Sequence, residues 1–163
     1  MEQKRAQDAR FVAALEEHRA AMFRVARAML HTDADAEDAV SAATLAAYQH
    51  LHMLRSWDSV RPWLMRITVR AGQRLLRTRR RECPADWAWR PELPPQPEAT
   101  PLWVYLEGLP TQYSLPLAMY YGEGMSLQEI AQALRLPKGT VSARITRGRQ
   151  ALKRQLEQEA REP

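Results

Sequence analysis

The sequence predicts an all-α protein in which two small helical domains are joined by a proline-rich linker. Apolar residues recur at helical spacing in both halves of the chain. Between the halves, residues 83–101 hold six prolines and no periodic pattern, as is typical of a semi-extended linker. A length of 163 residues suits one ordinary domain or two small ones. We therefore expect a helical domain over 8–82, a linker over 83–100 and a second helical domain over 101–160.

The charge balance points to an acidic partner. The net charge is +5 and the isoelectric point is about 9.8, and nucleic acid is the commonest acidic partner of a soluble chain. Cys83 is the single cysteine, which excludes an intramolecular disulfide and a thiolate cluster for zinc. The N-terminus is polar and no apolar run approaches the roughly twenty residues of a membrane span. These features predict a cytoplasmic protein without membrane insertion.

The first helix is predicted from Phe11, where apolar residues begin to recur at helical spacing. The apolar positions are Phe11, Leu15, Met22, Ala26 and Met29, and the arginines expected outside them are Arg19, Arg24 and Arg27. The pattern stops near His31, and either Thr32 or Asp33 can cap the next helix. Acidic residues in the first turn of that next helix favour its positive end.

The second helix combines an apolar seam with a face that carries no charge. Its seam consists of Ala36, Val40, Ala43, Ala47, Leu51 and Leu54. Between Val40 and Met53 there is no Asp, Glu, Lys or Arg. An exposed helix normally carries charge on its outer face, so this helix is either buried on two sides or covered by a partner, and both alternatives stay open.

A third long helix is predicted after a loop over 55–61, with Pro62 in its first turn. Its expected inner side is Leu64, Ile67, Ala71 and Leu75. Another arc carries Arg66, Arg70, Arg74 and Arg77, with Trp63 at its edge. A tryptophan beside arginines can stack on an unpaired base while the guanidinium groups hold the backbone. The alternative is that Trp57 and Trp63 pack locally, since large aromatic residues are usually mostly buried.

The second domain is predicted to contain four helices, beginning with 102–106 and a turn at Pro110. Ser114 is expected to cap the next helix, whose start Pro116 delays, and Gly122–Gly124 is expected to end it. That helix carries Leu117, Met119 and Tyr120. In the preceding linker, Trp87 and Trp89 are expected to dock on a domain or on a partner.

A helix-turn-helix is predicted over 126–152. Ser126 and Glu129 form a capping box at the start of its first helix, whose apolar stripe is Leu127, Ile130, Ala131 and Leu134. Pro137 opens the second helix after a very short turn. The inner stripe of that helix is Val141, Ile145, Gly148, Leu152 and Leu156, with Gly148 small enough to let another backbone approach.

The outer side of this second helix is a candidate docking face for phosphates and bases. Its candidate DNA-binding residues are Lys138, Thr140, Ser142, Ala143, Arg144, Thr146, Arg147 and Arg149. The alternative is an ordinary amphipathic hairpin whose arginines are solvated. No carboxylate appears between Ala131 and Gln155, so nothing there repels a phosphate backbone, which favours DNA binding.

An enzyme is not indicated. There is no glycine-rich phosphate loop, and His18, His31, His50 and His52 lack metal-ligand spacing. We therefore expect no catalytic residues, no metal site and no cofactor.

Six segments, in order along the chain, carry a family resemblance. They are Phe23–Arg27, Asp35–Val40, Arg61–Ile67, Leu106–Pro110, Gly124–Ala131 and Pro137–Arg144. The ordered set resembles the sigma-70 family of bacterial RNA polymerase sigma factors, in the compact extracytoplasmic-function (ECF) branch that keeps regions 2 and 4. The resemblance implies a factor that binds core RNA polymerase, recognises and melts promoter DNA, and is held by an anti-sigma factor.

The resemblance also implies roles for particular residues. Region 2 would contact the minus-ten DNA through Arg55, Trp57, Arg61, Trp63, Arg66, Arg70, Arg74 and Arg77, with Trp57 or Trp63 near an extruded base. The polymerase-binding residues would be Asp38, Ser41, Ala42, Leu45, Ala46 and Gln49. Two departures stand out. The polar contacts usual on the polymerase-binding helix are replaced by Ser41, Ala42, Thr44 and Ala46, and Arg70 and Arg74 stand where the family has asparagine and aspartate.

Two other functions fit the same features. A DNA-binding regulator could use the same helix-turn-helix without joining RNA polymerase. An adaptor could use its uncharged helix mainly to bind an inhibitory protein.

Overall fold

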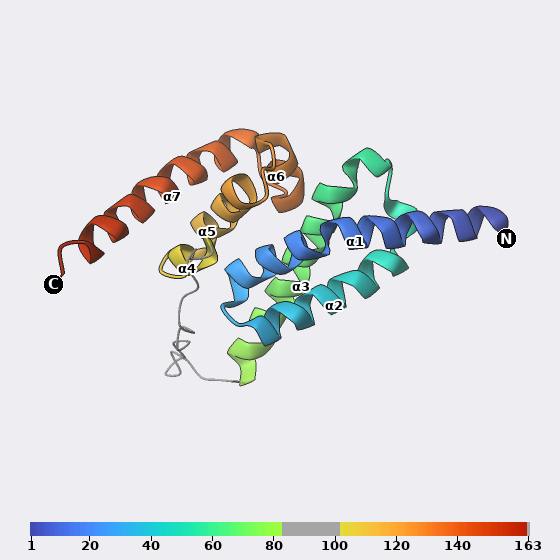
Figure 1. Ribbon diagram of the computed structural model, residues 1–163, viewed down its shortest axis with the longest axis horizontal. Helices are drawn as coiled ribbons and strands as arrows, with labels where there is room; N and C mark the ends of the chain where they lie inside the picture. The colour runs from blue at the N-terminus through green and yellow to red at the C-terminus, as the bar shows by residue number, and fades with distance from the viewer. Residues whose placement is uncertain (83–101, 163) are drawn as a thin grey trace.

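A computed structural model of the chain describes residues 1–82 and 102–162 (Figure 1). These residues are helical and contain no strand, which confirms the all-α prediction. The helices are α1 (Glu2–Leu30), α2 (Asp33–Gln49), α3 (Val60–Glu82), α4 (Leu102–Leu106), α5 (Thr111–Leu117), α6 (Leu127–Leu134) and α7 (Lys138–Glu159). Short 3-10 turns, η1 (Leu51–Met53) and η2 (Trp57–Ser59), precede α3, and a π turn, η3 (Ala118–Gly122), follows α5. The predicted linker, with Trp87 and Trp89, lies outside the described residues. No described helix is long and apolar enough to cross a bilayer.

The first unit is a bundle of α1, α2 and α3, which contact one another pairwise (Figure 1). Its core includes Phe11, Met22, Val25 and Leu64, each no more than 3% exposed. Helix α1 begins at Glu2, well before the predicted start at Phe11. Residues 2–10 consist mostly of good helix formers without Gly or Pro, so their propensity extends the helix beyond its apolar stripe.

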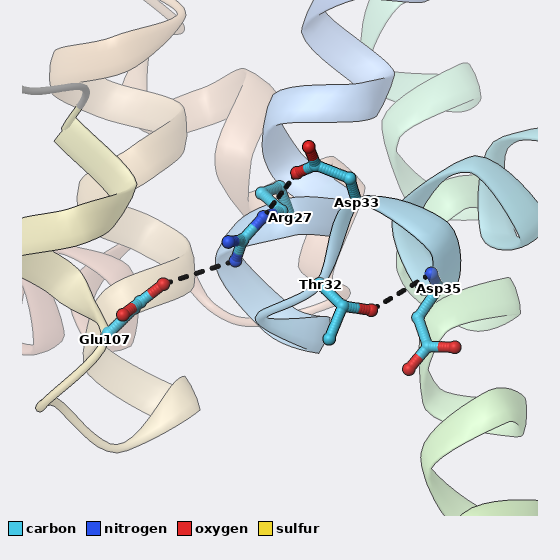
Figure 2. A network of polar contacts seen from close by, with 5 residues as sticks. All are labelled: Arg27, Thr32, Asp33, Asp35 and Glu107. Carbon is cyan, nitrogen blue, oxygen red and sulfur yellow. Dashed lines mark hydrogen bonds and ion pairs between the residues drawn. The ribbon is translucent and has the colours of Figure 1, made fainter. Parts of the chain in front are cut away.

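The corner between α1 and α2 is closed by local hydrogen bonds. His31 adopts the left-handed conformation with φ 63° and donates its N–H to the Arg27 carbonyl at 3.1 Å. Thr32 caps α2 by accepting the Asp35 N–H at 3.1 Å, which selects Thr32 over Asp33 as the cap. Arg27, predicted to lie outside, is buried at 7% exposure. Its guanidinium instead lies between Asp33 and Glu107, the latter from the second unit (Figure 2).

His31 should make stability depend on pH. Burial lowers the pKa of His31, the Glu107 carboxylate opposes this, and the nearby Arg27 guanidinium adds to it. The unfolded chain therefore takes up this proton first, so stability is lost as the pH falls below about 6.5 towards the lower folded pKa. In urea unfolding between pH 7.5 and pH 5.5, wild type should lose more stability than His31→Asn, which tolerates the left-handed backbone. Equal losses would contradict a lowered pKa for the half-buried His31.

Helix α3 buries a wider arc than the one predicted, and the predicted positions Ile67, Ala71 and Leu75 pack against the core at its edge. Leu64 is fully buried as expected, but Ile67, Ala71 and Leu75 are half-buried. The other fully buried positions are Met65 and Thr68, and Val69 is 5% exposed. Helix α3 packs against α1 and α2 and also against α6 of the second unit, so its buried surface is wider than a single stripe.

The second unit consists of α4, α5, α6 and α7, as predicted, but α5 begins early. It starts at Thr111 directly after Pro110, whereas a start capped by Ser114 was expected. Ser114 therefore lies inside the helix and is 1% exposed. Pro116 also lies inside, where it cannot donate to the Gln112 carbonyl, and the helix gives way to the π turn η3 two residues later.

The helix-turn-helix forms as predicted. The Glu129 N–H donates to the Ser126 hydroxyl at 3.1 Å, and the Ser126 N–H donates back to the Glu129 carboxylate at 3.3 Å. Arg135 ends α6 with φ 53°. On α7 the predicted inner stripe is buried through Gly148, but Leu152 is half-buried and Leu156 is 39% exposed, because the end of α7 extends beyond the core.

Gly148→Ala should destabilise the second unit. An added Cβ would lie 2.9 Å from Leu117 Cδ1 and 3.0 Å from the Tyr113 Cβ on α5, so the close approach predicted at Gly148 is made by side chains of that helix. We expect a loss of about 1–3 kcal/mol in the free energy of unfolding, typical of overpacking. Gly139→Ala on the same helix is the matched control, since nothing lies within 4 Å of its added Cβ. Chemical denaturation measures the stability of both variants. Equal stabilities of Gly148→Ala and Gly139→Ala would contradict the predicted overpacking.

Candidate nucleic-acid interface

The outer face of α7 presents the predicted docking residues together. Lys138, Ser142, Ala143, Thr146, Arg147 and Arg149 are exposed, and Thr140 and Arg144 are half-buried. Val141, Ile145 and Gly148 lie on the opposite, buried side. Arg149 Nη1 donates to the Tyr121 hydroxyl at 2.9 Å, so a residue of the turn η3 fixes the position of this guanidinium group. The face carries several cations and can approach a polyanion without a carboxylate between them.

The arginine arc of α3 is only partly exposed. Arg70, Arg74 and Arg77 are exposed, whereas Arg66 and Trp63 are half-buried, and Trp63 packs against the core. Trp63, which the sequence analysis placed at the edge of the arginine arc, is therefore a packing residue. The exposed arginines still form a cationic row, but the row lacks a free aromatic side chain.

The segment between α2 and α3 is built from tight turns. Ser59 N–H bonds the Ser56 carbonyl at 3.1 Å, and the Ser56 hydroxyl accepts the Asp58 N–H at 3.3 Å. Arg55 is exposed, while Trp57 is half-buried. The guanidinium of Arg10 lies 4.8 Å from the centroid of the Trp57 ring.

Arg61, predicted to face DNA, is paired across the two units. Its Nε and Nη2 donate to the two carboxylate oxygens of Glu129 at 2.8 and 2.6 Å. Hydrogen bonding from Arg61 lowers the pKa of Glu129, against the opposing effect of desolvation. The same carboxylate is part of the α6 capping box, so it serves the helix and the domain contact at once.

Two further ion pairs join the units, and sequence reasoning missed both. Arg24 donates to Glu123 through two bonds of 2.5 and 2.8 Å, and that hydrogen bonding raises the pKa of Arg24. Arg27 Nη1 donates to Glu107 at 3.3 Å (Figure 2). The paired residues lie 80 and 99 positions apart in sequence. No local pattern relates such positions, and the sequence offers no signal for them.

Helix α2, which carries no charged residue after Asp38, is buried on one side only. Its buried residues are Ala36, Ala39, Val40, Ala43 and Ala47. On the other side Leu45 is 60% and Tyr48 is 47% exposed, so the alternative of burial on two sides is wrong for the described part of the chain. Leu45 and Tyr48 line a shallow groove together with Phe11 and the exposed Val12 of α1. Asp8 and Arg19 of α1 also line the groove, so its α2 side is uncharged while its α1 side carries charge. An apolar surface of this kind suits a protein partner.

The other predicted residues of α2 lie around this groove. Asp38, Ser41, Ala42 and Gln49 are exposed, and Ala46 is half-buried. Ser41 lines the groove together with Leu45. Elsewhere, the described residues contain no group of three or more His, Cys, Asp or Glu side chains placed to hold a metal ion.

Two family models match the chain. One is described as Sigma-70 region 2 and matches residues 14–82. The other is described as Sigma-70, region 4, and matches residues 100–152. Together they cover both helical units described above.

Individual proteins show the same similarity. The chain is 29% identical over 154 residues to the ECF RNA polymerase sigma factor SigE of Mycolicibacterium smegmatis, covering 84% of this chain and 58% of that protein. It is 29% identical over 153 residues to the RNA polymerase sigma-H factor of Pseudomonas aeruginosa, covering 82% of this chain and 79% of that protein. The chain thus spans little more than half the length of the first relative.

Two solved structures share the fold. The sigma factor RpoE, in a co-crystal structure with the anti-sigma factor NepR from Bartonella quintana, matches with a TM-score of 0.75 and 19% identity over 90% of this chain and 96% of that one. CnrH, in complex with the cytosolic domain of CnrY, matches with a TM-score of 0.66 and 24% identity over 90% and 87%.

Proposed function

Because the chain belongs to the ECF branch of the sigma-70 family, we propose that it binds core RNA polymerase and directs promoter recognition and melting at transcription initiation. The observation that carries the proposal is the presence of two different surfaces in one chain. The helix-turn-helix offers a cationic face on α7, and the region 2 unit offers an uncharged apolar face on α2. A regulator that never joins polymerase has no need of the second surface. We place the domain boundaries at 8–82 and 101–160, with the linker between them.

The region 4 unit would place α7 in the major groove of the minus-thirty-five element. Side chains near the start of α7 are the ones able to reach bases, with Ser142, Ala143, Arg144 and Thr146 nearest. Lys138, Thr140, Arg147 and Arg149 are better suited to phosphates, since cations on the flanks fix the register of a helix on DNA without reading sequence.

The region 2 unit would hold the melted strand. Arg70, Arg74 and Arg77 are exposed on α3 and suit the backbone. Trp57 suits the extruded base better than Trp63 does, because Trp57 lies in the turn η2 whereas Trp63 lies within α3; both side chains pack in part against the core. Arg61 is held by Glu129 in this arrangement, so its use on DNA requires the two units to separate.

Helix α2 would bind the polymerase. The proposed contact residues are Asp38, Ser41, Ala42, Leu45, Ala46 and Gln49, most of which lie on the exposed side described above. The contact would depend on apolar burial more than on ion pairs, because this side carries no charge between Val40 and Met53. Both solved neighbours are complexes, with NepR in one and CnrY in the other. We propose that an anti-sigma factor likewise holds this protein inactive in the cytoplasm.

Run-off transcription on a genomic promoter library tests the proposal. The protein with core RNA polymerase should give promoter-specific transcripts, and core enzyme alone should not. A Leu45→Arg variant places a charge at the centre of the proposed polymerase contact, so transcription and pull-down of core should both fall while duplex DNA binding persists. DNA binding without any capture of core polymerase would favour the regulator, and capture of an inhibitor without DNA affinity would favour the adaptor.

Arg147→Ala should weaken binding to all DNA sequences alike. Arg147 is exposed on α7 and is assigned to a phosphate, and losing one phosphate contact reduces the slope of log K against log salt by about 1. Titration of promoter and unrelated duplexes at several salt concentrations measures both effects. Arg161→Ala, an exposed arginine beyond the end of α7, is the control. An unchanged salt slope would remove Arg147 from the interface.

A further inference from the structure

We infer that Arg10 is a positioning residue for capture of an unpaired promoter base, acting through Trp57. The inference rests on the proposed function, because it assigns Arg10 to the melting step of that function. Arg10 lies outside both family-model matches, which cover residues 14–82 and 100–152, so the resemblance assigned it no role.

The N-terminal part of α1 is anchored on the end of α2. Phe11 is buried at 3% exposure, and its ring lies 5.7 Å from the Tyr48 ring. Leu51, in the turn that follows α2, is also buried at 7% exposure. The anchoring fixes the adjacent residue, Arg10, over the segment that leads into α3.

Arg10 is therefore held above the half-buried ring of Trp57. Its guanidinium carbon lies 4.8 Å from the Trp57 centroid, within the range of a cation–π contact. No ion pair joins Arg10 to a carboxylate in 1–82 or 102–162. A planar guanidinium suits this position because it lies flat on an indole face, whereas an ammonium group is a compact point charge.

The backbone around Trp57 does not fix the ring by itself. The bonds within η2 join Ser56 to Asp58 and to Ser59, and Arg55, Ser56, Asp58 and Ser59 are all exposed. They order the turn, and the Trp57 ring also packs in part against the core. Arg10 adds a contact to the ring from another helix, so core packing and the guanidinium together pre-orient the ring before DNA arrives. Pre-orientation lowers the entropy lost when a base stacks on the ring.

A double-mutant cycle tests the inference. Wild type, Arg10→Ala, Trp57→Ala and the double variant are each combined with core polymerase on a promoter selected in the run-off experiment. The rate of promoter opening is followed by the fluorescence of 2-aminopurine at the extruded position. Arg10→Ala should slow opening by about threefold to tenfold, the size expected of an ordinary cation–π contact. Because Arg10 acts through Trp57, the double variant should open promoters no more slowly than Trp57→Ala alone.

Two controls separate positioning from a general effect of charge or folding. Arg5→Ala removes another exposed arginine of α1 and should open promoters at the wild-type rate. Arg10→Lys should recover only part of the rate, since it keeps the charge but not the planar group. On a promoter with a pre-opened bubble, Arg10→Ala should still bind more weakly than wild type, because stacking on Trp57 is needed there too.

The outcomes distinguish this inference from the proposed function. No transcript from wild type on any promoter would overturn the proposed function itself. With an active wild type, equal rates for Arg10→Ala and Arg5→Ala would overturn the role of Arg10. Additive effects of the Arg10→Ala and Trp57→Ala substitutions would also overturn it, since they would mean that Arg10 acts independently of the ring.

Discussion

Arg27→Ala is expected to lower the free energy of unfolding by about 3 kcal/mol, the lower end of the cost of removing one partner from a buried ion pair. Arg27 is 7% exposed. Its Nε donates to Asp33 at 2.9 Å and its Nη1 to Glu107 at 3.3 Å. Asp33 is largely solvated, but the Glu107 side chain is only 18% exposed and would keep a poorly compensated charge. Chemical denaturation at neutral pH measures the loss.

The same variant should also loosen the contact between the two units. Figure 2 shows Arg27 reaching from the α1–α2 corner on one side to Glu107 of the second unit on the other. Lys153→Ala is the control, because its 4.0 Å pair with Glu157 is between exposed side chains and should change stability by no more than about 0.5 kcal/mol. If Arg27→Ala cost no more than this control, the buried arrangement of Arg27 would be wrong.

Arg27 illustrates what the sequence can and cannot predict about this fold. Local signals were sufficient where the partner is nearby, as in the Ser126–Glu129 capping box, and they narrowed the cap of α2 to Thr32 or Asp33. Local signals failed where the contacting residue is remote in sequence. Arg27 is adjacent to the apolar stripe of α1, and nothing in that stripe shows that Glu107 closes over it from 80 residues away.

The predicted inner side of α3 was too narrow for the same reason. Periodicity marks one stripe, but α3 packs against the first unit and against α6. The position of α5 was misjudged for a different reason. Pro116 was expected to delay the start of the helix, yet the helix begins at Thr111, contains Pro116 and leads into the π turn η3.

In the candidate interface, too, local contacts could be predicted from the sequence and remote contacts could not. The outward face of α7 could be read from spacing, because an amphipathic helix places its polar side opposite its apolar stripe. The pairing of Arg61 with Glu129 could not, because Glu129 was recognised only as a helix cap. The contact between Arg10 and Trp57 joins two segments that no periodic pattern relates.

Arg24→Glu is expected to separate the two units. The Glu123 side chain is only 6% exposed and accepts two bonds from Arg24, at 2.5 and 2.8 Å. Glutamate at position 24 replaces this charge-assisted pair by two carboxylates in contact, a change on the order of 2–4 kcal/mol for a partly buried site. Small-angle X-ray scattering should show a larger radius of gyration for Arg24→Glu at low salt. Wild type should approach that value only near 1 M salt, where the screening length falls to about 3 Å.

The charge-swapped variant Arg24→Glu/Glu123→Arg decides whether this pair, and not the substitution as such, holds the units together. It restores opposite charges at the same place, so its radius of gyration should return towards that of wild type. Lys153→Glu makes the same change in net charge at an exposed site of α7 and should leave the radius unchanged. Separation also frees Arg61 from the neighbourhood of Glu129, so Arg24→Glu should bind promoter DNA more tightly than Lys153→Glu. An Arg24→Glu protein as compact as wild type would mean that the Arg27–Glu107 and Arg61–Glu129 pairs and the packing of α3 on α6 hold the units together without the Arg24–Glu123 pair.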